Sequence, residues 1–235
     1  MTEAFWTIHE GLPRQGPGTP EDVAWAVAQI ELPEDAAICD AGAGPGADIP
    51  ALLAAAPRGH VTAVETHADF VEEIATRHGC DRVDARQSDM AEITGPYDLI
   101  WSAGAVYFLG VTEALTAWRA ALARGGAVAF SHICRFADLP ESARGFWAEA
   151  YPDLTDEDGI RAQIAAAGFT TLATRRLSAE AWAAYHGPLQ ARIDALRARA
   201  DDALTAALDD EQAEIDLHRS TGETWGYLLC VVRPT

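Results

Sequence analysis

Apolar and polar positions over residues 36–132 alternate between two kinds of segment. Short runs that are apolar almost throughout predict strands at 36–40, 60–65, 82–86, 97–102 and 126–132. Segments whose apolar residues recur at helical spacing lie between them, at 47–56, 68–78 and 112–123. Strands that alternate with helices predict a parallel sheet covered by helices, and apolar runs of this kind are typical of strands buried on both faces.

The flanking segments extend this pattern in both directions. Before the first strand, Thr19 is a suitable N-cap and Pro20 a suitable first residue for a helix that reaches about Ile30. After residue 135 we expect a helix at 155–167 that ends at Gly168, a strand at 169–177, two or three helices within 178–186 and 189–217, and a last strand at 224–232.

The charge balance limits the classes of partner. Acidic residues outnumber basic ones by 36 to 17, which gives a formal net charge of −19. Such a chain repels polyanions, so we expect no nucleic-acid partner and no binding to an anionic membrane surface. The N-terminus has no signal-peptide pattern and no apolar run is long enough to cross a bilayer, so we expect a cytoplasmic protein.

The four cysteines, Cys39, Cys80, Cys134 and Cys230, have no spacing typical of a metal site, and no metal is expected. Cys39, Cys134 and Cys230 lie in or beside apolar runs and are interpreted as buried, reduced thiols.

The glycine-rich loop Asp40-Ala41-Gly42-Ala43-Gly44-Pro45-Gly46 joins the first predicted strand to the next helix. Glycine lets the backbone approach a ligand closely, and the following helix presents free N–H groups, so the loop is typical of a nucleotide-type site. Gly42-x-Gly44-x-x-Ala47 also fits the dinucleotide fingerprint. The Asp40 carboxylate, however, would repel a pyrophosphate and suits an amino group. Glu65 ends the second strand, where an acidic residue can accept hydrogen bonds from ribose hydroxyls in either cofactor class.

Several segments resemble the motifs of class I S-adenosylmethionine-dependent methyltransferases. Asp40-x-Gly42-x-Gly44 looks like their first motif, Glu65 like the second, and Asp89 occupies the position that often bonds the adenine amino group. The segments 97–102 and 124–126 resemble the fourth-strand motif and the glycine turn of the family. Longer segments across nearly the whole chain resemble a bacterial subgroup that acts on small molecules, namely 14–21, 101–107, 146–152 and 225–227. The chain departs from this subgroup at Ala43, Pro45 and His132, the last standing where an acidic residue is frequent.

The resemblance implies S-adenosyl-L-methionine as cofactor, S-adenosyl-L-homocysteine as product, and a single methyltransferase domain over 1–235. The expected fold is an α/β three-layer sandwich around a seven-stranded, mostly parallel sheet. Its last strand is antiparallel, and a helical lid at 178–220 precedes that strand. The residues expected at the cofactor are Arg14, Asp40, Gly42, Ala43, Gly44, Gly46, Glu65, Thr66, Ser88, Asp89, Met90, Ser102 and Ala103.

The acceptor site is expected among aromatic and histidine side chains, which suit a flat, apolar or cationic acceptor. These are Trp6, Tyr107, Trp147, Tyr151, Trp182, Tyr185 and His186. His132, at the carboxyl end of the fifth strand, and Tyr107 are the candidate catalytic residues. Ordinary core packing is the alternative for each aromatic, and a structural role is the alternative for His132.

The resulting hypothesis is methyl transfer by in-line displacement to a small-molecule acceptor. The absence of an Asn/Asp-Pro-Pro-aromatic motif after the fourth strand argues against methylation of nucleic-acid bases. The alternatives are an NAD-dependent oxidoreductase and a non-catalytic cofactor-binding protein of the same fold. The sequence leaves open the acceptor atom, the use of a general base and the formation of a homodimer.

Overall fold

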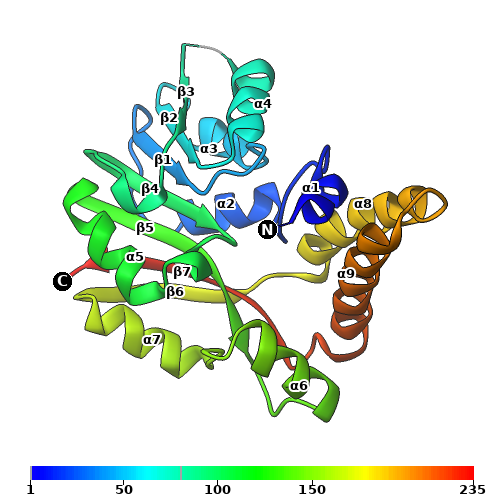
Figure 1. Ribbon diagram of the computed structural model, residues 1–235. Helices are drawn as coiled ribbons and strands as arrows, with labels where there is room; N and C mark the ends of the chain where they lie inside the picture. Colours follow the sequence, from blue (N-terminus) through cyan, green and yellow to red (C-terminus); the bar gives the residue numbers. More distant parts are fainter. Residues whose placement is uncertain (1, 80) are drawn as a thin grey trace.

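A seven-stranded sheet of order β3-β2-β1-β4-β5-β7-β6 forms the centre of the computed structural model, which describes residues 2–79 and 81–235 (Figure 1). Its strands are β1 (Ala37–Ala41), β2 (His60–Glu65), β3 (Val83–Gln87), β4 (Tyr97–Ala103), β5 (Leu122–Arg135), β6 (Phe169–Arg176) and β7 (Trp225–Pro234). Neighbouring strands from β3 to β5 pair in parallel, whereas β7 is antiparallel to both β5 and β6. The predicted α/β sheet with an antiparallel last strand is therefore confirmed.

Helices cover both faces of this sheet and complete the expected three layers. One face packs against α2 (Pro20–Val27), α3 (Ile49–Ala55) and α4 (Ala68–His78) through one apolar cluster. The opposite face packs against α5 (Val111–Trp118) and α7 (Glu157–Ala166) through another. The predicted start of α2 is also confirmed, because Thr19 and Asp22 form a capping box with Pro20 in the first turn.

The remaining helices gather beyond the carboxyl ends of the strands. They are α1 (Glu3–His9), α6 (Glu141–Ala150), α8 (Ala179–Arg197) and α9 (Asp202–Thr221). Figure 1 shows α8 and α9 as a pair that projects from the sheet, with α1 beside it. Ile8 of α1, Ile193 of α8 and Ile215 of α9 share one buried apolar cluster, so the three helices form a small core of their own.

Several element boundaries differ from the sequence-based expectations. Pro188 lies inside α8, so the expected gap between 186 and 189 is wrong. The chain turns instead before Asp201, whose side chain accepts a hydrogen bond from Leu204 N and begins α9. Helices α1 and α6 were not expected. The strand β5 extends to Arg135 because its end pairs with Trp225–Tyr227 of β7, and short 3-10 turns η1 (Met90–Glu92), η2 (Val106–Phe108) and η3 (Arg119–Ala121) follow β3, β4 and α5.

Three of the four cysteines are buried, as expected, and Cys80 lies outside the described residues. Burial raises the pKa of Cys39, Cys134 and Cys230, so these thiols are protonated and unreactive near neutral pH. Within the described chain, no helix combines the length and apolar character needed to span a bilayer.

Candidate active site

The loop between β1 and α3 turns sharply under the carboxyl ends of the strands. Gly42 has a φ of 75°, and its N–H and that of Ala43 donate hydrogen bonds to Val64 O at 2.9 and 3.1 Å. A Cβ atom at Gly42 would lie 2.5 Å from the Cβ of Ala105. Both the positive φ and this close approach require glycine, so the loop conformation follows directly from its sequence.

Glu65, at the end of β2, organises the same loop. Its Oε2 accepts a hydrogen bond from Gly44 N at 2.9 Å, and its Oε1 accepts from Thr66 N at 2.7 Å and His67 N at 2.9 Å. The carboxylate therefore joins two turns at the edge of the sheet. It lies at the position that the sequence suggested for a contact with ribose hydroxyls.

Arg14 reaches the loop from the segment between α1 and α2. Its Nε donates to Gly16 O at 2.6 Å, and its guanidinium pairs with Asp48 Oδ1 at 3.2 Å. Asp48 Oδ2 in turn accepts a hydrogen bond from Trp101 Nε1 at 2.9 Å. The Arg14 and Asp48 side chains are 11% and 8% exposed, so this is a largely buried ion pair.

Asp40 carries a carboxylate that is only 3% exposed. Burial raises its pKa well above the ordinary value, the Asp48 and Glu65 carboxylates add to this effect, and Arg14 opposes it. A site of this kind favours a cationic ligand group, because such a group would offset the unfavourable burial of negative charge.

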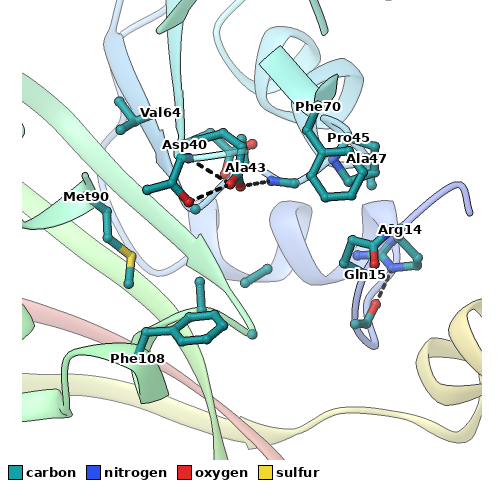
Figure 2. Close-up of a pocket in the computed structure, with 18 of the residues that line it drawn as sticks. Arg14, Gln15, Asp40, Ala43, Pro45, Ala47, Val64, Phe70, Met90 and Phe108 are labelled. Carbon is teal, nitrogen blue, oxygen red and sulfur yellow. Dashed lines mark hydrogen bonds between the residues drawn. The ribbon is translucent and has the colours of Figure 1, made fainter. Parts of the chain in front are cut away.

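These groups line a cavity of about 400 Å³, which we call the loop cavity. Figure 2 shows Asp40, Met90, Phe108 and Arg14 around this space. Most of the residues expected at the cofactor line it: Arg14, Asp40, Gly42, Ala43, Gly44, Glu65, Thr66, Ser88, Asp89, Met90 and Ala103. Asp89 also caps the turn η1, since its Oδ1 accepts a hydrogen bond from Ala91 N at 2.8 Å.

Gly46 and Ser102 were expected at the cofactor but do not line the loop cavity. A Cβ at Gly46 would face Ile49 at 2.8 Å, so this glycine allows close packing of the loop on α3. Ser102 is fully buried and donates a hydrogen bond to Ala41 O at 2.8 Å, which joins β4 to β1. Their positions indicate a structural role.

Sequence reasoning did not select several other residues of the loop cavity. Phe5 from α1, Phe70 from α4 and Phe108 from η2 line it, as does Asp48. Trp6, expected at the acceptor, lines this cavity too. The centroid of its ring lies 3.8 Å from the ring centroid of His67. The position of Asp48 just before α3 was the sequence feature that could have indicated it. The sequence of α1 carries no pattern that predicts its position beside the loop cavity.

A second cavity of about 210 Å³ adjoins the first, and we call it the aromatic cavity. Phe5, Gln15, Gly16, Gly104 and Tyr107 line both cavities. Tyr107, Trp147, Tyr151, Trp182 and Tyr185, all expected at the acceptor, line the aromatic cavity together. Phe146 and Tyr227 add to its walls, and Glu211 and Glu214 of α9 supply two carboxylates that sequence reasoning missed.

His132 and His186 line neither cavity. Successive side chains of a strand point to opposite faces, and in β5 it is Ile133 that lines the aromatic cavity. His132 is buried, and its Nε2 lies 3.3 Å from Tyr151 Oη. Burial lowers the pKa of His132 to about 4, so it is neutral near pH 7. His132, the residue predicted as a general base, therefore lies behind the wall of the aromatic cavity.

The chain is similar to known proteins in one family model and in the fold of several solved structures. Residues 38–126 match the family model of a methyltransferase domain. A S-adenosylmethionine-dependent methyltransferase from Geobacter sulfurreducens in complex with S-adenosyl-L-homocysteine is similar over 100% of this chain and 99% of its own, with a TM-score of 0.82 and 19% identity. Its counterpart from Thiobacillus denitrificans, in the same type of complex, has a TM-score of 0.81 and 18% identity over 100% and 99% of the two chains. YjhP from E. coli has a TM-score of 0.82 and 18% identity over 100% of both chains.

No curated protein matches the chain significantly by sequence. Residues 38–126 nevertheless match the model of a methyltransferase domain, and the whole chain has the Rossmann-like fold of class I S-adenosylmethionine-dependent methyltransferases. The fold that the resemblance implied is therefore confirmed.

Proposed function

We propose that this protein transfers a methyl group from S-adenosyl-L-methionine to a small-molecule acceptor and releases S-adenosyl-L-homocysteine. The observation that carries this proposal is the loop cavity. Around one space it brings together a buried carboxylate, a cation and a glycine loop within a methyltransferase domain.

The residues of the loop cavity fit this cofactor group by group. The Asp40 carboxylate suits the amino group of the methionine moiety, and Arg14 suits its carboxylate. We infer that Glu65 binds the ribose hydroxyls and that Asp89 binds the adenine amino group, since both line the loop cavity. Val64, Met90 and Phe70 supply apolar surface for the adenine ring.

S-adenosyl-L-methionine supplies a methyl group already activated on a sulfonium, so the protein contributes alignment and exclusion of water. Gly104 and Tyr107 line both cavities, which supports the proposal that donor and acceptor meet beside them. Tyr107 is 39% exposed and lies in the turn after β4. We assign it a positioning role at this junction.

The aromatic cavity is the proposed acceptor site, and its size indicates a small molecule. The pair α8–α9 would act as its lid, because Trp182 and Tyr185 of α8 and two glutamates of α9 form part of the wall. We further infer a cytoplasmic location, because three buried unpaired thiols are typical of a reducing compartment. Cell fractionation would test the location, and sedimentation would show whether the protein forms a homodimer.

Calorimetric titration with S-adenosyl-L-homocysteine tests the cofactor, and titration with NADH is the matched comparison. We expect micromolar binding of the former and none of the latter, because Asp40 opposes a pyrophosphate. Binding of NADH alone would favour an oxidoreductase. Binding of S-adenosyl-L-homocysteine without methyl transfer to any member of a broad metabolite panel would favour a non-catalytic binding protein.

A further inference from the structure

We propose that the methyl acceptor is an amine that enters the aromatic cavity as an ammonium ion, and that Glu214 is the catalytic residue that removes its proton. This inference rests on the methyltransferase function proposed above and adds the class of acceptor and the base.

The walls of the aromatic cavity suit a cation. Aromatic rings surround the space, from Phe5, Tyr107, Phe146, Trp147, Tyr151, Trp182, Tyr185 and Tyr227. Ring faces attract ammonium groups, and the attraction grows when water is excluded. Among the described residues, no arginine lines this cavity, and the chain contains no lysine. Among the described residues that line this cavity, the acidic side chains are therefore the two glutamates of α9, which favours a cationic acceptor over an anionic one.

Glu211 and Glu214 differ in their surroundings. Glu211 Oε1 lies 3.0 Å from His9 Nε2, and His9 Nδ1 lies 2.8 Å from Gln15 Oε1. Gln15 Nε2 donates in turn to His9 O at 3.0 Å, so Glu211 belongs to a closed network. Glu214 lines the cavity and, among residues 2–79 and 81–235, forms no hydrogen bond or ion pair. Its carboxylate is thus available to a ligand.

Titratable side chains surround Glu214 from each of the elements packed against it. Glu211 lies on the same helix, His9 on α1, Tyr107 in η2, Tyr185 on α8 and Tyr227 on β7. Burial raises the pKa of Glu214 to about 7, Glu211 adds to the rise, and His9 opposes it. A carboxylate in this range is a stronger base than an exposed one and still ionises near neutral pH, as a general base requires.

The proposed reaction balances in two steps. Glu214 accepts a proton from the bound ammonium, which leaves a neutral amine with a free electron pair. The nitrogen then attacks the sulfonium methyl carbon of the donor: the N–C bond forms, and the C–S bond breaks with its electron pair left on sulfur. The product is a methylated ammonium ion and a neutral thioether, and Glu214 later loses its proton to water.

Amines, alcohols and carboxylates that share one carbon skeleton distinguish this class of acceptor from others. We would titrate each into protein saturated with S-adenosyl-L-homocysteine, using benzyl, phenethyl and butyl skeletons. We expect each amine that binds to do so about tenfold or more tightly than its alcohol, since only the ammonium gains from ring faces and carboxylates. The carboxylic acids should not bind.

The substitution Glu214→Gln tests the base, and Asp210→Asn is its matched control. Asp210 lies on the same helix, is exposed, does not line either cavity and loses the same charge. In E214Q, amine affinity should fall about tenfold and kcat/KM about a hundredfold or more, while affinity for S-adenosyl-L-homocysteine stays within about twofold. The rise of kcat/KM with pH through about 7 should also disappear. In D210N all of these quantities should match the wild type.

Glu214→Asp is the control for a folding defect, because it keeps the carboxylate charge on a side chain that is one methylene shorter. It should retain the preference for amines with a lower kcat. The proposal is overturned if S-adenosyl-L-homocysteine binds but no amine binds more tightly than its alcohol, or if E214Q and D210N behave alike. Either result leaves the proposed function standing. Absence of S-adenosyl-L-homocysteine binding would instead refute the proposed function, and this inference with it.

Discussion

The Arg14 guanidinium and the Asp48 carboxylate form an ion pair of 3.2 Å beside the glycine loop, and both side chains are nearly buried. The pair ties the segment before α2 to the residue that precedes α3. Trp101, on β4, donates a hydrogen bond from its Nε1 to the second carboxylate oxygen of Asp48. Because a buried charge that loses its partner is costly, we expect this relationship to affect both stability and the loop cavity.

Replacing Arg14 with methionine should lower the free energy of unfolding by about 3 kcal/mol, because Asp48 and the nearby Asp40 lose their neighbouring cation. Affinity for S-adenosyl-L-homocysteine should fall at least about tenfold. Urea denaturation and calorimetry measure the two effects. The control is Arg58→Met, which breaks an exposed pair with Glu34 and should cost at most about 1 kcal/mol. Equal losses in the two variants would contradict a special role for Arg14.

The sequence was sufficient to predict the central sheet and the polar groups of the loop cavity that follow its strands. Strand and helix alternate over short distances, and the chemistry of the loop lies within consecutive residues, from Asp40 to Gly46. Glu65 and Asp89 follow predicted strands, and the carboxyl ends of parallel strands meet at one edge of a sheet. Local sequence patterns and the rule for the carboxyl ends of parallel strands are therefore enough to predict where these residues lie.

The aromatic cavity was harder to predict because it depends on how distant helices pack. The pairing of His9 with Glu211 joins residues far apart in the chain, and helical periodicity gives only the face on which Glu211 lies. The strand β5 shows a second limit. A difference of one position decides whether His132 or Ile133 faces the cavity, and the side chain at 133 is the one that does.

Asp40→Asn should weaken cofactor binding without a loss of stability. The Asp40 carboxylate is buried, and its raised pKa indicates that the folded protein holds the charge at a cost. The amide removes that cost, so the melting temperature should stay the same or rise. Affinity for S-adenosyl-L-homocysteine should fall at least about tenfold, because a charged partner for the amino group is lost. A parallel fall in melting temperature and affinity would indicate instead that Asp40 is mainly structural.

Gly42→Ala separates backbone strain from close approach, with Gly11→Ala as a matched control. The two glycines have φ values of 75° and 73°, but a Cβ at Gly11 meets nothing within 4 Å, whereas one at Gly42 meets Ala105 Cβ at 2.5 Å. G11A should cost about 1–2 kcal/mol from the backbone alone. G42A should cost more and should also reduce affinity for S-adenosyl-L-homocysteine, because the loop must shift. If both variants are destabilised equally and both bind the cofactor product normally, the contact with Ala105 is unimportant.

Acid sensitivity should depend in part on His132. Burial lowers its pKa to about 4 in the folded protein, against an ordinary value of 6.5, so the unfolded chain binds this proton first. The stability linked to this histidine is therefore complete above about pH 6.5 and is lost as the pH falls towards 4, by up to about 3 kcal/mol. His132→Leu removes the ionisable group, so melting curves from pH 7.5 to 4.5 should show a shallower loss of stability than in the wild type. His132 lines neither cavity, so the variant should bind S-adenosyl-L-homocysteine normally at pH 7.5. An unchanged pH dependence would mean that His132 is not held neutral by burial, and a loss of cofactor-product binding would place it closer to the site than its contact with Tyr151 indicates.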